Sequence, residues 1–160
     1  MSEIEIRRPG RGAEAGPPST DAPRGFALLA LGFRPLYLLA ATFAALGVPL
    51  WLAVYAGIIA APPHVPPMLW HAHEMVYGFA IAVIAGFLFT AGQVWTGLST
   101  PKGWPLAAIC LLWIAARIAN WVAVPMLAMA LDAAFLIAVM LPLGSVLWRS
   151  NNTRNLFVLA

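Results

Sequence analysis

Four long apolar runs, separated by short polar or proline-rich stretches, dominate the chain. They cover residues 36–60, 69–92, 104–124 and 126–148, and each is long enough to cross the hydrocarbon core of a bilayer as a helix. The prolines of segment 61–67 keep the first loop extended. We therefore expect an all-α protein, a polytopic transmembrane helix bundle with four complete spans.

The two ends of the chain differ from this pattern. Residues 1–24 are rich in Pro, Gly and Arg and lack apolar periodicity, so we expect a disordered cytoplasmic tail ahead of a transmembrane domain at 25–160. Residues 155–160 are apolar again but too few to cross a bilayer. We interpret them as the start of a fifth span, and the chain as part of a longer protein whose remaining helices would be its partners.

Composition agrees with a membrane location. The chain is 62% hydrophobic and 9% charged, whereas soluble domains carry about 25% charged residues. With alternating spans, all Lys and Arg outside the apolar runs fall on one side, which predicts a cytoplasmic N-terminus. Basic runs interleaved with aromatics are absent, which argues against nucleic-acid binding. Phosphate loops, dinucleotide turns and nucleophile elbows are absent too, which argues against a nucleotide enzyme or soluble hydrolase.

Three charged residues lie inside the predicted spans, where each costs roughly 2.5–3.5 kcal/mol near the bilayer centre. Counting about 1.5 Å per residue from the predicted outer ends places Glu74, Arg117 and Asp132 at roughly the same depth, about 8–10 Å. We expect Arg117 to pair with Glu74, with Asp132, or with both.

Two histidines stand beside this layer, in the string Trp70-His-Ala-His-Glu-Met75. On a regular helix His71 and His73 are 200° apart, so they cannot bind one ion from one helix. His71 shares a face with Glu74 and Met75, and His73 shares the opposite face with Tyr77. We therefore expect the two histidines to have different surroundings.

The face of His71 continues as a ridge of small residues spaced by four. Such a ridge allows a second helix, or a flat macrocycle, to approach the backbone closely. The residues are Gly78, Ala82, Gly86 and Thr90.

Histidine and methionine together favour metal chemistry in the outer layer. Imidazole with thioether suits Cu(I), and imidazole alone suits haem iron. The candidate metal ligands are His71, His73 and Met75, and the candidate cofactor-binding residues are His71, His73, Glu74 and Arg117. The structural alternative is that the histidines are satisfied polar residues and the methionines fill gaps in the packing.

Several strings resemble the NnrS family. They are Leu31-Gly-Phe-Arg-Pro-Leu-Tyr-Leu-Leu-Ala40, Trp70-His-Ala-His-Glu-Met-Val-Tyr-Gly-Phe79, Arg117-Ile-Ala-Asn120 and Arg154-Asn-Leu-Phe157. The resemblance implies a multi-pass protein of the bacterial inner membrane that contains haem and copper and takes part in the response to nitric oxide and nitrosative stress. The resemblance itself assigns no ligand. From position and chemistry we expect His71 to ligate one metal centre, and His73 to ligate the other or to support it. Glu74 and Arg117 would set the local charge, Arg117 by meeting a haem propionate. The resemblance names no catalytic residue.

Two other interpretations of the polar layer remain open. A multi-pass transporter or proton-coupled carrier would use Glu74, Arg117 and Asp132 as a gate or relay, with Pro49 and Pro142 as hinges. A helical scaffold would use the same polar layer only to fix its packing.

Overall fold

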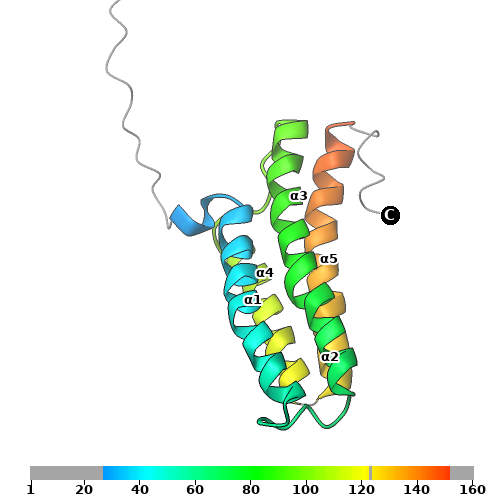
Figure 1. Ribbon diagram of the computed structural model, residues 1–160. Coiled ribbons are helices and arrows are strands. Elements are labelled where there is room, and N and C mark those ends of the chain that lie inside the picture. The colour runs from blue at the N-terminus through cyan, green and yellow to red at the C-terminus, as the bar shows by residue number, and fades with distance from the viewer. Residues whose placement is uncertain (1–26, 123, 152–160) are drawn as a thin grey trace, which may run out of the picture.

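The computed structural model describes residues 27–122 and 124–151, and within them the elements are all helical (Figure 1). Four helical stretches are long and apolar enough to cross a membrane, which confirms the expected bundle. The predicted tail at 1–24 and the fifth-span residues 155–160 lie outside the described residues. In chain order the elements are η1 (Ala27–Ala30), α1 (Phe33–Tyr55), α2 (Pro67–His73), η2 (Glu74–Ala80), α3 (Ile81–Thr96), α4 (Trp104–Trp121) and α5 (Pro125–Arg149).

Two helices end earlier than the hydropathy predicts. α1 continues through Pro49 but ends at Tyr55 instead of residue 60, and Gly57 follows with a φ of 74°. That left-handed conformation is open to glycine at little cost and terminates helices. α4 ends at Trp121 instead of residue 124, because a residue that precedes a proline, here Val124, is pushed out of the helical region.

The second span is not the regular helix that was expected over residues 69–92. Helix continues from Pro67 to Thr96, but its middle section η2 is a π-helix. A π-helix closes its hydrogen bonds from residue i to i+5, which changes the angle between successive side chains. Hydropathy cannot detect such a change, because the residues are equally apolar in either helix type.

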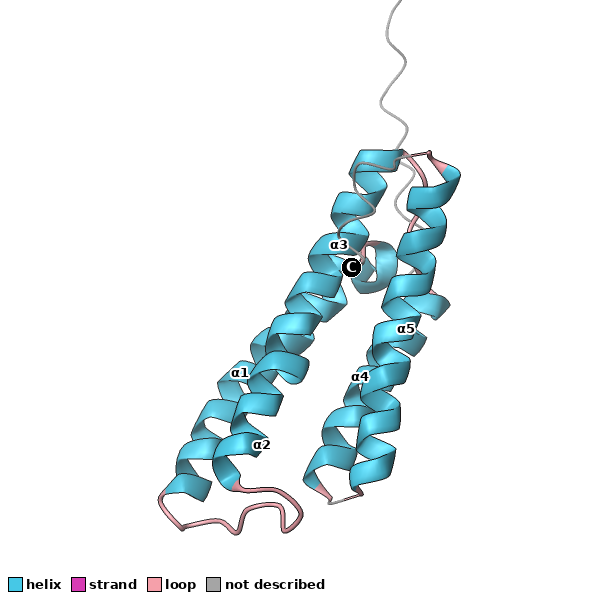
Figure 2. Ribbon diagram, turned by 90° about the vertical axis from the view of Figure 1, so that its right-hand side faces the viewer, coloured by secondary structure: helices cyan, strands magenta, loops and turns pink. Residues whose placement is uncertain are grey.

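The helices form two hairpins (Figures 1 and 2). The first hairpin is α1 with the long helix Pro67–Thr96, and the second is α4 with α5. α1 packs along α3, α4 packs along α5, and contacts between α3 and α5 join the two hairpins. Figure 2 shows the hairpins diverging toward the end of the bundle where the loop 56–66 lies, here called the proline-loop end.

An apolar core fills the bundle away from the proline-loop end. Its largest members come from both hairpins and include Leu36, Phe89, Leu106, Trp113 and Phe135, all of them buried.

The ridge of small residues packs against α1. A Cβ atom added to Gly78 would lie 2.6 Å from Phe43, and one added to Gly86 would lie 2.9 Å from Tyr37. The Thr90 hydroxyl donates to the Gly86 carbonyl at 3.1 Å. Of the two occupants considered for this ridge, the structure therefore has a helix.

Candidate functional site

Four ionisable side chains meet between the hairpins, toward the proline-loop end. The first hairpin supplies His73 and Glu74, and the second supplies Arg117 from α4 and Asp132 from α5. Arg117 Nη1 lies 2.9 Å from Glu74 Oε2, and Arg117 Nη2 forms a close ion pair with Asp132 Oδ1. Glu74, Arg117 and Asp132 are buried. The expected pairing of Arg117 is confirmed, and it involves both carboxylates.

His73 lies between the same two carboxylates. Its Nδ1 is 3.3 Å from Glu74 Oε1 and its Nε2 is 3.3 Å from Asp132 Oδ2. An ionised carboxylate only accepts hydrogen bonds, so the doubly protonated imidazolium satisfies both contacts at once. Two carboxylates, one guanidinium and one imidazolium then have zero net charge, which lowers the cost of burying the cluster in a membrane.

Asn120 completes the cluster, and the sequence-based list of site residues omitted it. Its Nδ2 donates to the Ala116 carbonyl at 3.0 Å and to Asp132 Oδ2 at 3.2 Å. The side chain of Asp132 is thus held by Arg117, His73 and Asn120 together. The available signal was spacing, because Asn120 follows Arg117 by three residues and so lies on the same helix face.

His71 has different surroundings, as the helical wheel predicted. Its ring stacks on Trp51 of α1, with centroids 4.1 Å apart and planes 20° apart. His73 instead stacks on Tyr77, with centroids 4.7 Å apart. Among the described residues, none forms a hydrogen bond with the His71 ring, and Glu74 pairs with His73 and Arg117 instead of His71. Met75 is half-buried.

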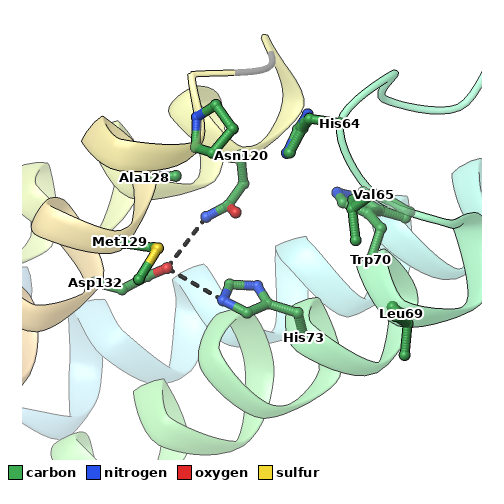
Figure 3. A pocket seen from close by; sticks show the side chains of 10 residues that line it. His64, Val65, Leu69, Trp70, His73, Asn120, Ala128, Met129 and Asp132 are labelled. Atoms are coloured by element: carbon green, nitrogen blue, oxygen red, sulfur yellow. Dashed lines mark hydrogen bonds and ion pairs between the residues drawn. The ribbon is translucent and has the colours of Figure 1, made fainter.

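A cavity of about 300 Å³ opens beside the charged cluster (Figure 3). Its lining combines the loop residue His64 and Trp70 on one wall with Asn120, Met129 and Asp132 on the other, and His73 reaches across from α2. A second cavity, of about 320 Å³, shares His73, Met129 and Asp132 with the first. The cluster therefore borders open space on the side of α5.

The residues expected to bind haem or copper differ in how well their surroundings suit that role. Within the described ranges, no group of three or more His, Cys, Asp or Glu side chains is arranged to hold a metal ion. Both nitrogens of His73 face carboxylates, whereas the His71 ring, which has no hydrogen-bond partner among the described residues, would have a nitrogen available to hold haem iron. Arg117 already serves two carboxylates, which leaves it a poor partner for a haem propionate.

Comparisons with known proteins identify the family. Neither the curated proteins nor the solved structures contain a match to this chain. The family model described as "NnrS protein" matches residues 27–160, which include all four candidate membrane spans and the whole charged cluster. The chain is therefore a multi-pass membrane protein that belongs to the NnrS family.

Proposed function

We propose that the chain binds haem in the membrane and acts in the response to nitric oxide, and thereby in resistance to nitrosative stress. The observation that carries this proposal is His71. It lies in a membrane-spanning helix, its ring has no hydrogen-bond partner among the described residues, and Trp51 supports one face of the ring. An imidazole held in this way would be able to hold haem, and bound haem would supply an iron that takes nitric oxide.

The chain's own residues would orient and tune this site. Stacking on Trp51 restricts rotation of the His71 ring, because a tilted imidazole would lose the contact. The cluster of His73, Glu74 and Arg117 begins two residues further along the chain and supports the site by fixing the local charge. In this proposal His73 holds carboxylates in place and does not ligate a metal.

The proposal includes copper binding only in general terms. It rests on what the resemblance to the NnrS family implies, and His71 and Met75 remain candidate ligands. Because the described residues contain no complete ligand group, we derive no chemical step through copper.

We also propose a bacterial inner-membrane location with a cytoplasmic N-terminus. Lys102 and Arg149 flank spans at the end opposite the proline-loop end, while the loop 56–66 contains no Lys or Arg. Cytoplasmic loops carry the excess of basic residues in membrane proteins. The proline-loop end would then face the periplasm.

The absorption spectrum of the purified protein tests the haem proposal. His71→Ala should abolish or shift the Soret band, because it removes the axial nitrogen. His73→Ala is the comparison variant, two residues away on the same helix. It changes the local charge without removing the proposed ligand, so it should keep haem bound and shift the Soret band less than His71→Ala does. A Soret band unchanged in His71→Ala would remove that residue from the haem site, and loss of the band only in His73→Ala would reverse the assignment.

A further inference from the structure

The two hairpins are joined by different forces at the two ends of the bundle. Away from the proline loop, α3 packs on α5 through apolar side chains. Toward the proline loop, α2 has no extensive packing on α4 or α5 within the described residues, apart from the edge contact of Trp70 with Trp121 at 5.3 Å. The hairpins are joined there mainly by charge.

The charged contacts cross the boundary between the hairpins in a reciprocal way. Each hairpin carries one carboxylate and one basic side chain, and each basic side chain reaches a carboxylate of the other hairpin. Arg117 contacts Glu74, and His73 contacts Asp132. Loss of either carboxylate therefore removes a connection between hairpins without disturbing the apolar core.

The space next to these contacts is large enough for small molecules. The two adjoining cavities have volumes of about 300 and 320 Å³. Since liquid water occupies about 30 Å³ per molecule, each could hold on the order of ten waters. Figure 3 shows His73 and Asp132 among the residues that line the first cavity, with a dashed line for their ion pair.

The lining of the first cavity offers unused hydrogen-bonding groups. Trp70 is 5% exposed, and its Nε1 has no hydrogen-bond partner; neither has the buried Nδ1 of His64. Asn120 uses both amide hydrogens on Ala116 and Asp132, so its oxygen is left to accept. An unpaired buried donor costs several kcal/mol in a hydrocarbon environment, which favours a polar occupant.

The charges determine which polar occupant fits. In both cavities anions would meet the Asp132 carboxylate and cations would meet the His73 side chain, while the cluster as a whole is neutral. We propose that the proline-loop end contains an aqueous cleft, which admits water and small uncharged molecules with both donor and acceptor groups, and whose width the two ion pairs between the hairpins limit. This function is additional to haem binding and does not depend on it.

Cysteine accessibility tests the cleft directly. The background is Cys110→Ala, which removes the single native thiol. Ala128→Cys places a thiol in the cavity lining. Ala119→Cys is a control that is equally buried but does not line the cavity, and Ile137→Cys is a control on an exposed apolar surface. The probes are neutral methyl methanethiosulfonate and its anionic sulfonatoethyl and cationic trimethylammonioethyl analogues.

A hydrated cleft predicts a specific order of rates. The thiolate is the reacting species, so Ala128→Cys should react with the neutral reagent about tenfold faster than either control, and faster than with the charged reagents. Adding Asp132→Asn should raise the rate at Ala128→Cys and reduce the preference for the neutral reagent. Glu74→Gln removes the other carboxylate contact and should also raise the rate at Ala128→Cys. It replaces Asp132→Asn in the test if that variant does not fold.

Two results would overturn the proposal. If Ala128→Cys reacts no faster than Ala119→Cys, the cleft is dry. If neither carboxylate substitution changes the rate at Ala128→Cys, the ion pairs do not control access. Because the assay detects thiols and not haem, its outcome is separate from that of the Soret experiment.

Discussion

Different interactions join the helices in the two halves of the bundle, the half near the proline loop and the half away from it. Away from the loop, small residues of the second span bring α1 close, and aromatic and aliphatic side chains fill the space between hairpins. Near the loop, ion pairs connect hairpins that diverge, and cavities lie beside them. Apolar packing provides a rigid base, whereas charge-based contacts are specific and can be broken without unfolding that base.

Removal of the shared cation should produce the largest effect. Arg117→Met would leave Glu74 and Asp132 buried with only His73 between them, and loss of one partner from a buried ion pair typically costs about 3–5 kcal/mol. Unfolding of the purified protein in detergent micelles measures the loss. The triple variant Glu74→Gln, Arg117→Met, Asp132→Asn removes these three charges together and leaves only His73, which can become neutral by losing a proton, so it should recover most of the stability. Equal losses in the single and triple variants would contradict a charge-based connection.

Overpacking of the opposite half should have a smaller effect. A Cβ on Gly86 would lie 2.9 Å from Tyr37 Cδ1 and 3.2 Å from Leu36 Cβ, so Gly86→Ala should cost about 1–3 kcal/mol through strain between α1 and α3. The same unfolding assay applies. Ala72→Leu, at an exposed position of the same long helix, should change stability by less than about 0.5 kcal/mol. Similar values for both variants would show that the ridge is not tightly packed.

The stacked pair should give the smallest effect on stability. Trp51→Leu removes the ring contact with His71, and aromatic pairs contribute about 0.5–1.5 kcal/mol beyond the area they bury. A double-mutant cycle with His71→Leu isolates this contact in the unfolding assay. Strictly additive losses would mean that the two rings do not support each other.

The sequence predicts the regular parts of this molecule well, because a bilayer imposes simple rules. Span length, apolar content and the high cost of charge were sufficient to locate the helices and to place Glu74, Arg117 and Asp132 at one level. The helical wheel also predicted correctly that His71 and His73 have different surroundings, because both residues precede η2 and lie on a regular helix.

Apart from the pairing of Arg117 with the two carboxylates, the contacts between helices could not be predicted from the sequence. The pairing of His73 with Asp132 depends on the rotation of α5 about its own axis, which a single-helix wheel does not contain. The stacking of His71 on Trp51 depends equally on where α1 lies. Asn120 and Trp70 line the same cavity only because the loop and the two hairpins lie close together in the folded chain. A single-helix analysis does not contain that arrangement.

The π-helical section between Glu74 and Ala80 has a consequence for how this chain tolerates change in length. A π turn accommodates more residues per turn than an α turn while the helix on either side keeps its direction. The second span can therefore lose one position within this section, which returns the section to a regular α-helix, without turning its flanks away from their neighbours. Insertions and deletions elsewhere in the same span would instead rotate one half of the helix against the other and expose polar side chains to lipid.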